Sequence, residues 1–318
     1  MRRTFVARTA ACALLALGLT TAPALTANAA PGHAVKVAAN AADPDIFHAA
    51  GKYYIYSTGG GYPVRSSTSP TGPYTATNKT MTTMPGWVID DPSKQNPWAP
   101  HVFQTSKDGA PLYVMYFTAK RGSGWDANCV GTAVSRQPDR GFVATGGPVC
   151  EAQSQEAIDA TDFQDGSGQR WLVYKTHSGG TYRIRAVKVD AAGLNPGTDR
   201  RTVVSNDGEM EAPSFVFHGG TLWMFASTAA AGKHYDDCSY STTVWKAPSF
   251  ASTFTRGRTV ISQDLHGLCG PGGATIINDG GVYRIAFHSW PNPSNRTGDR
   301  AGWVGEIRWT ADNVPFLY

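Results

Sequence analysis

The sequence predicts an all-β protein, a five-bladed β-propeller, and three observations support this fold class. After residue 40 there is no convincing amphipathic helix, only short runs of aromatic and β-branched residues separated by Gly, Pro, Asn, Asp and Ser. The 35 Gly and 20 Pro residues supply turns, and a charged fraction of 16% is low enough for many sheets with apolar faces. The third observation is an internal repeat, which gives five blades.

Each copy of the repeat has an extended start that carries an acidic residue, Pro or Ala, then a polar turn with Gly, and then an aromatic strand. The five copies occupy residues 43–56, 99–116, 159–174, 211–225 and 270–287. Their starts lie 52 to 60 residues apart, which suits a four-stranded blade with long loops. Because no Pro-rich or Ser-rich linker separates the copies, we expect residues 30–318 to form one propeller domain. A two-sheet sandwich with coincidental spacing is the alternative.

Residues 1–29 have the composition of a secretory signal peptide. Three arginines precede an apolar run at residues 10–19, and the small residues Ala27 and Ala29 suit a cleavage site after position 29. The apolar run is about half as long as a membrane-spanning helix, so a permanent anchor is the less favoured alternative. We therefore expect a secreted, extracellular protein.

The charge of the remaining chain excludes partners that are recognised mainly by electrostatics. The full chain has 28 basic and 24 acidic residues, and the leader takes away three basic residues and no acidic ones. A net charge of about +1 remains. This balance gives no case for binding nucleic acid or a membrane surface.

Four cysteines remain once Cys12 leaves with the leader, and an even number in an exported chain predicts disulfides. Proximity in the sequence favours Cys129 with Cys150 and Cys238 with Cys269, although four cysteines allow three pairings. No spacing matches a zinc signature.

Three of the repeats start with an acidic residue, namely Asp43, Asp159 and Glu211. The first strand of each propeller blade lines the central channel, so these residues are expected to converge although they are far apart in sequence. Glycoside hydrolysis needs one carboxylic acid and one carboxylate, and a third charge can tune the acid. We place all three in the same structural position of their repeats. Each alone could instead cap a turn.

At these positions the chain resembles glycoside hydrolase family 43, over essentially the whole mature sequence. The matching motifs are Ala42-Asp43-Pro44-Asp45-Ile46, Trp98-Ala99-Pro100, Ile158-Asp159 and Glu211-Ala212-Pro213. The resemblance implies that Asp43 is the general base, that Asp159 modulates and orients the acid, and that Glu211 is the general acid. It also implies inversion at the anomeric carbon, for which the two carboxyl groups stand roughly 6.5 to 9.5 Å apart.

Four further residues are candidates for binding the substrate. Trp98 could stack on a sugar face, although it could equally be a core residue between blades. Arg300 resembles an arginine that binds substrate hydroxyls in exo-acting members of the family. Asp45 lies two residues after Asp43 and competes with it as the base, but the family pattern favours Asp43. His288 is the fourth candidate.

The sequence predicts no cofactor and no metal site. In the commoner family pattern, Gly-Pro-Gly is followed by a histidine that often approaches the pocket through calcium, and this chain has Gly273 there. His101, His266 or His288 could take over that role, so calcium stays open as an alternative, but a lone histidine in a β-rich chain more often serves packing or hydrogen bonding.

We therefore expect a secreted hydrolase that cleaves pentose glycosides of plant cell-wall oligo- or polysaccharides as a monomer. The form Glu-Ala-Pro with Gly-Pro-Gly-Gly favours an α-L-arabinofuranosidase or exo-arabinanase. A β-xylosidase of the same family and a non-catalytic carbohydrate-binding propeller are the alternatives. The motifs leave exo or endo action undecided.

Overall fold

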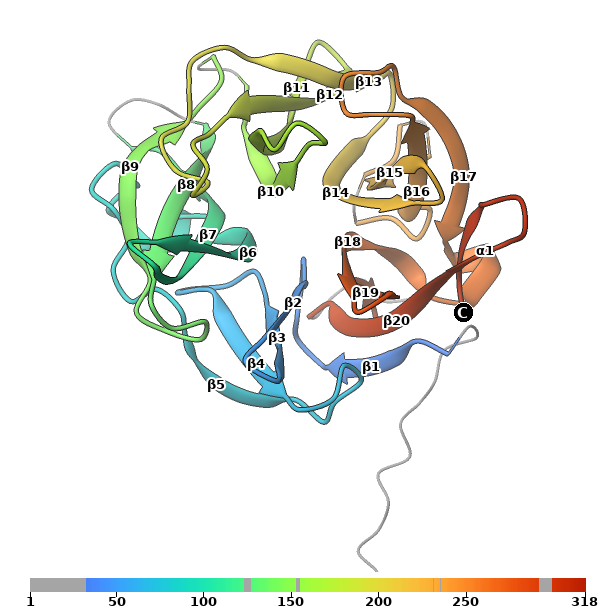
Figure 1. The fold of residues 1–318 in the computed structure, drawn as a ribbon, viewed down its shortest axis with the longest axis horizontal. Coiled ribbons are helices and arrows are strands. Elements are labelled where there is room, and N and C mark those ends of the chain that lie inside the picture. The colour runs from blue at the N-terminus through green and yellow to red at the C-terminus, as the bar shows by residue number, and fades with distance from the viewer. Residues whose placement is uncertain (1–32, 123–126, 153–154, 231, 235, 292–298) are drawn as a thin grey trace, which may run out of the picture.

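The computed structural model describes residues 33–122, 127–152, 155–230, 232–234, 236–291 and 299–318. The expected signal peptide at residues 1–29 lies outside these residues. The described chain folds into five antiparallel sheets arranged around a central axis (Figure 1). The predicted five-bladed propeller is thus confirmed. Within the described residues no helix is long and apolar enough to cross a membrane.

Each of the first four blades is a meander of four strands in sequence order. The first two blades consist of β2 (Asp45–Ala49), β3 (Lys52–Tyr56), β4 (Pro63–Ser67) and β5 (Thr75–Lys79), and of β6 (Trp98–Lys107), β7 (Ala110–Lys120), β8 (Asn128–Ser135) and β9 (Val143–Val149). The next two consist of β10 (Ile158–Gln164), β11 (Arg170–Ser178), β12 (Thr181–Lys188) and β13 (Arg201–Asn206), and of β14 (Met210–His218), β15 (Thr221–Thr228), β16 (Ser241–Ala247) and β17 (Thr255–Ile261). The inner strands β2, β6, β10 and β14 therefore begin the repeats found in the sequence.

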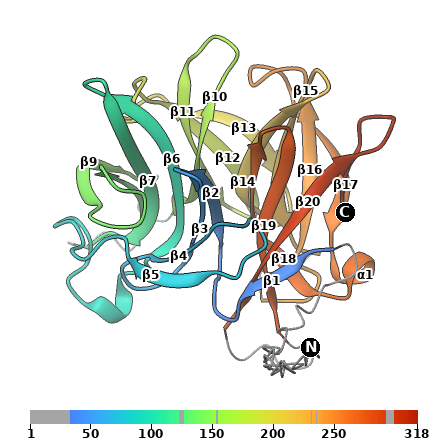
Figure 2. The ribbon, with the colours of Figure 1, turned by 60° about the horizontal axis from the view of Figure 1, so that its bottom comes forward.

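The fifth blade joins the two ends of the chain. It contains β18 (Cys269–Asp279), β19 (Val282–Trp290), β20 (Ala301–Trp309), β21 (Pro315–Leu317) and, from the start of the chain, β1 (Val35–Ala38). Strand β1 pairs with β20 in register Val35 to Val304, and Figures 1 and 2 show the two strands side by side. This pairing closes the ring, which protects the edge of the last sheet. The sequence analysis did not anticipate it.

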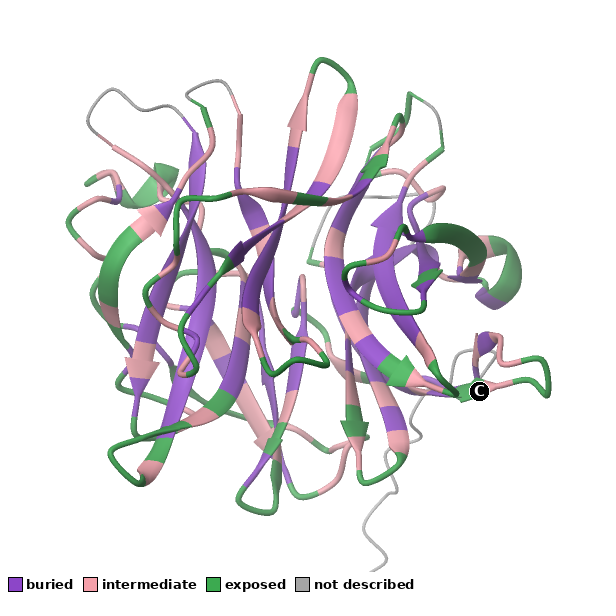
Figure 3. Ribbon diagram, turned by 45° about the horizontal axis from the view of Figure 1, so that its top comes forward, coloured by how far each residue is buried: buried purple, intermediate pink, exposed green. Residues whose placement is uncertain are grey.

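The apolar core is divided among the five contacts between neighbouring blades. Each contact has its own buried cluster, represented by Tyr56 with Met115, Tyr116 with Leu172, Val173 with Met224, Phe225 with Ile285, and Ile46 with Ala286. Figure 3 shows the buried residues along the strands and the exposed residues mainly in the loops. Because every blade packs on two neighbours, the inner strands are held at fixed positions around the axis.

Two disulfides confirm the pairing favoured by proximity. Cys129 of β8 is bonded to Cys150 just after β9, within the second blade. Cys238, before β16, is bonded to Cys269 at the start of β18, and this bond links the fourth blade to the fifth. Both bonds restrict the unfolded chain and stabilise the fold by that means.

Candidate active site

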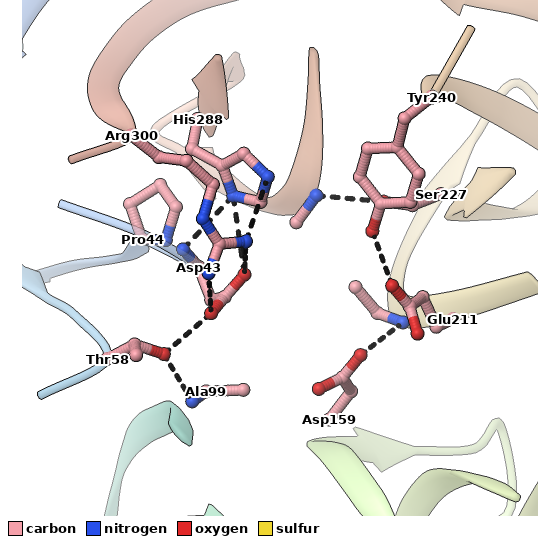
Figure 4. Close-up of polar contacts among 12 residues, drawn as sticks. Asp43, Pro44, Thr58, Ala99, Asp159, Glu211, Ser227, Tyr240, His288 and Arg300 are labelled. Carbon is pink, nitrogen blue, oxygen red and sulfur yellow. Dashed lines mark hydrogen bonds and ion pairs between the residues drawn. The ribbon is translucent and has the colours of Figure 1, made fainter. Parts of the chain in front are cut away.

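The three carboxylates from the heads of the repeats lie in one axial pocket. The pocket has a volume of about 450 Å³, and its lining includes Asp43, Asp159, Glu211, Trp98 and Arg300. These side chains come from all five blades, since Arg300 directly precedes β20. Figure 4 shows Asp43 on one side of the pocket, with Asp159 and Glu211 on the other. The fold thus brings together residues that are up to 257 positions apart in the chain.

Near the start of each inner strand, a residue at the equivalent position lies in the left-handed backbone region. The five residues are Asp43, Ala99, Asp159, Ala212 and Gly273, with φ between 41° and 58°. Four of them carry a Cβ, for which this conformation costs roughly 1 kcal/mol or more. Glu211 stands one residue before this position, so it does not occupy the same position as Asp43 and Asp159, as the sequence analysis assumed. The same register shift occurs in the inner strands of the second, third and fifth blades, and it places Glu211 level with Trp98, Ile158 and Gly272.

A ring of hydrogen bonds holds these five backbone N–H groups. Four of the acceptors lie near the end of the second strand of the preceding blade: Thr58 accepts from Ala99, Thr118 from Asp159, Ser227 from Gly273 and His288 from Asp43, over 2.8 to 3.2 Å. The fifth N–H, of Ala212, donates instead to Oδ2 of Asp159 at 3.1 Å. The ring fixes the backbone beneath the catalytic candidates, and none of its hydroxyl acceptors was singled out from the sequence.

The surroundings of Asp43 stabilise its ionised form. Thr58 Oγ1 donates to Oδ2 at 2.6 Å, and the Arg300 guanidinium donates to Oδ1 at 3.1 Å and to Oδ2 at 3.4 Å. Burial alone would raise the pKa of Asp43, but the Arg300 charge and the hydrogen bonds from Thr58 and Arg300 outweigh burial and lower it. A carboxylate that keeps its negative charge in this way can accept a proton from water.

Asp159 behaves in the opposite way. Burial, then the charge of Glu211, then that of Asp43 raise the pKa of Asp159 well above its usual range. The Asp159 carboxyl group accepts a hydrogen bond from Ala212 N–H and lies beside Glu211. It therefore retains its proton at a pH at which Asp43 has lost its own. Carboxyl groups with opposed ionisation are the pattern expected of an acid and a base.

Glu211 is buried and held by two residues that sequence analysis missed. The Tyr240 hydroxyl donates to Glu211 Oε1 at 2.8 Å, and Lys175 Nζ lies 3.4 Å from Oε2. Lys175 also donates to Glu156 at 2.6 Å. A lysine directly after the apolar run Trp171 to Tyr174 was the available signal, because a cation in that context is paired when it is buried.

The substrate-binding candidates fall into two groups. Trp98 lines the pocket and is 36% exposed, as a platform for a sugar ring requires. Arg300 also lines the pocket, yet its guanidinium faces Asp43. Asp45 and His288 are 1% and 0% exposed, so neither offers a surface to a sugar, contrary to expectation. Asp45 accepts a hydrogen bond from Val102 N–H at 2.8 Å.

His288 is buried and holds the backbone of Asp43. Its Nδ1 accepts a hydrogen bond from Asp43 N–H at 3.1 Å, and its Nε2 lies 3.3 Å from Arg300. Burial and the Arg300 charge lower the pKa of His288 to about 3, so the imidazole is neutral. A Cβ at Gly273 would come within 2.6 Å of this ring. Gly273 is therefore required by the position of His288.

The residues present do not fit a calcium site. Among the described residues there is no group of three or more His, Cys, Asp or Glu side chains arranged to hold a metal ion. Both ring nitrogens of His101 are engaged, with Asp45 and Asp162 at 2.9 Å each. His266 lies in the short helix α1 (Gln263–His266) beside Ser262. Neither His101 nor His266 is part of the pocket lining, and His288, whose ring fills the space beside Gly273, has both ring nitrogens engaged.

The sequence matches known glycosidases along most of its length. The sequence model of glycosyl hydrolases family 43 matches residues 90–315. The "Probable arabinan endo-1,5-alpha-L-arabinosidase A" of Aspergillus flavus is 27% identical over 303 residues, which cover 87% of this chain and 89% of the relative. The arabinan endo-1,5-alpha-L-arabinosidase C of Emericella nidulans is 24% identical and covers 76% of this chain and 80% of its own length.

Solved structures share the fold at lower sequence identity. A thermostable family-43 glycoside hydrolase superposes with a TM-score of 0.74 and 18% identity, covering 92% of this chain and 95% of its own. The Cellvibrio cellulosa alpha-L-arabinanase in complex with arabinohexaose gives a TM-score of 0.69 and 17% identity, with 88% and 96% covered. These similarities establish the same propeller architecture.

Proposed function

Because this chain belongs to glycosyl hydrolases family 43, we propose that it cleaves L-arabinofuranosyl linkages of arabinan with inversion at the anomeric carbon. The observation that carries this proposal is the opposed ionisation of two carboxyl groups that face one pocket: Arg300 and Thr58 lower the pKa of Asp43, whereas burial and Glu211 raise that of Asp159. Asp43 can then accept a proton while the side of the pocket with Asp159 and Glu211 retains one.

The proposed reaction is a single displacement. A water molecule beside Asp43 attacks the anomeric carbon and gives a proton to the Asp43 carboxylate, while the bond from that carbon to the leaving oxygen breaks. Glu211 donates a proton to the leaving oxygen, so the products are a free sugar of inverted configuration and an alcohol. Asp159 holds the backbone at Ala212, next to Glu211, and keeps a proton on this side of the pocket. Solvent then returns both side chains to their starting states.

The substrate assignment rests on the named relatives and on the sequence motifs. The relatives named above are arabinan endo-1,5-alpha-L-arabinosidases, and an exo-1,5-alpha-L-arabinanase from a bovine ruminal metagenomic library shares the fold with a TM-score of 0.67. The motifs favour an α-L-arabinofuranosidase or exo-arabinanase. Cleavage of plant cell-wall arabinan from its chain ends is therefore proposed, with endo cleavage as the alternative that the relatives' names favour.

Export and a monomeric state complete the proposal. Two disulfides suit a protein that folds in an oxidising compartment, and an insoluble cell-wall polymer has to be met outside the cell. Signal cleavage after Ala29 can be checked by sequencing the amino terminus of the exported protein, and the mass in solution can be measured by light scattering.

The experiment that tests the function is incubation with debranched arabinan, xylo-oligosaccharides and nitrophenyl pentosides. We expect arabinose to be released from debranched arabinan, and the Glu211→Gln protein to release at most about 1% as much, because a positioned general acid contributes about 10²- to 10⁴-fold. A ladder of oligosaccharides would favour endo action, and faster release of xylose would favour the β-xylosidase. Binding without release of sugar would reject the hydrolase in favour of the carbohydrate-binding propeller.

A further inference from the structure

Lys175 is the exception in the ring of hydrogen bonds beneath the pocket. In four blades the residue at this place of the second strand accepts a hydrogen bond from the backbone of the next blade, and those residues are Thr58, Thr118, Ser227 and His288. In the third blade Lys175 occupies this place. It lies two residues after Val173 on the second strand, and Val173 pairs with Thr161 of the inner strand. An ammonium group has no lone pair to accept a hydrogen bond, so Lys175 cannot perform this task.

The replacement has two consequences for the pocket. The Asp159 carboxylate takes over the orphaned N–H of Ala212, which fixes Asp159 beside Glu211. The ammonium of Lys175 turns to the carboxylates of Glu156 at 2.6 Å and Glu211 at 3.4 Å. Lys175 is only 3% exposed, and a buried cation is tolerated only where anions compensate its charge.

On the premise that Glu211 is the proton donor, we propose that Lys175 is a positioning residue that stabilises the Glu211 carboxylate formed as the proton passes to the leaving group. A fixed charge aimed at the place where charge develops lowers the barrier, and it acts more strongly in a pocket that excludes water. Glu156 holds the ammonium in place, since it accepts the shorter of the two contacts.

Several other charged or titratable groups face this pair. Glu211 also accepts a hydrogen bond from the Tyr240 hydroxyl and lies near the charge of Asp159. Lys175 faces the Tyr182 ring at 5.4 Å, and His177 lies 3.4 Å from Glu156. Within this described set Lys175 is the only cation that directly contacts Glu211. Removing Lys175 therefore takes away the positive charge that contacts the Glu211 carboxylate and leaves the Tyr240 hydrogen bond in place.

The test compares Lys175→Met, Lys175→Arg and, as a matched control, Lys246→Met, which removes an exposed lysine that rests on Trp223. The substrates are 2,4-dinitrophenyl and phenyl arabinofuranosides. Dinitrophenolate is a weak base and leaves without receiving a proton, whereas phenolate needs a proton from the general acid as it leaves. We expect Lys175→Met to lower kcat about 100-fold on the phenyl substrate and less than about threefold on the dinitrophenyl substrate. The alkaline limb of its pH–rate profile should move to higher pH, and Lys175→Arg should recover most of the lost rate.

Other outcomes would overturn the proposal. Equal losses on both substrates would mean that Lys175 has only a structural role, and a Lys175→Met protein that behaves like Lys246→Met would mean that it has none. If Lys175→Met does not fold, Glu156→Gln decides: it keeps the ammonium but removes its anchor, and we expect about a tenfold loss confined to the phenyl substrate. A uniform loss, or no loss, would contradict the proposal. A wild-type protein that cleaves neither aryl arabinofuranosides nor aryl xylosides would overturn the proposed function as well.

Discussion

At the residue scale, the ionisation of Asp43 depends on side chains that come from other parts of the chain. Arg300 approaches from the start of β20, His288 from β19, and Thr58 from the segment after β3. Arg300 and Thr58 keep the carboxylate ionised although it is partly buried, and His288 holds the backbone of Asp43. The sequence alone identified Asp43 from its repeat and Arg300 from a family resemblance, but not the contact between them, because that contact depends on how the first and last blades meet.

The pH dependence of activity should report this contact. The Arg300 charge lowers the pKa of Asp43, so we expect the acidic limb of kcat/KM in Arg300→Met to move to higher pH. Arg284→Met is the control, since Arg284 pairs with Glu306 on the sheet and is not part of the pocket lining. An acidic limb that stays in place in Arg300→Met would show that Asp43 is not the group that must be ionised.

At the element scale, one imidazole joins three inner strands. The ring of His101 on β6 contacts Asp45 of β2 and Asp162 of β10 at 2.9 Å each. Burial would lower the pKa of His101, but the two carboxylates outweigh it and raise this pKa to about 10. The histidine is therefore an imidazolium at neutral pH and connects the first three blades.

This connection makes a prediction about stability and pH. A group whose pKa is raised by folding contributes stability that is fully present below its unfolded pKa of about 6.5 and is lost as pH rises through about 10. We expect the difference in unfolding free energy between wild type and His101→Asn to be largest near pH 6 and to shrink toward pH 10. The exposed pair of His48 and Asp279 serves as control, because His48→Asn should change stability little at any pH. A difference that does not vary with pH would contradict the charged state of His101.

The elements also show how far the sequence alone could lead. The five repeats predicted the blades and the axial position of Asp43 and Asp159, because strand length, turns and period are local properties. The closing pair of β1 with β20 could not be predicted in this way, since it depends on two strands at opposite ends of the chain. The register error at Glu211 has a different origin: aligning Ala212-Pro213 with Ala99-Pro100 would have placed Glu211 level with Trp98, as the bulge that both strands share does.

At the scale of the whole molecule, the two disulfides should have unequal effects on function. The Cys129–Cys150 bond closes a loop of 21 residues and the Cys238–Cys269 bond one of 31. Replacing both cysteines of either bond by serine should lower the free energy of unfolding by about 3 kcal/mol. Cys238 stands two residues before Tyr240, which holds Glu211, so only the second pair should also lower kcat. Thermal unfolding and kinetics at 25 °C measure the two effects separately. Equal loss of kcat in both pairs would contradict this arrangement.

In the proposed mechanism, the propeller brings the base Asp43 and the acid Glu211 from different blades to opposite sides of one pocket. The most direct test of this account is a proton NMR time course of an α-1,5-linked arabino-oligosaccharide with a high concentration of the protein. Displacement by water activated by Asp43 predicts that the β-anomer of the new reducing sugar appears first and that the α-anomer grows later by mutarotation. Initial appearance of the α-anomer, or no cleavage at all, would contradict it.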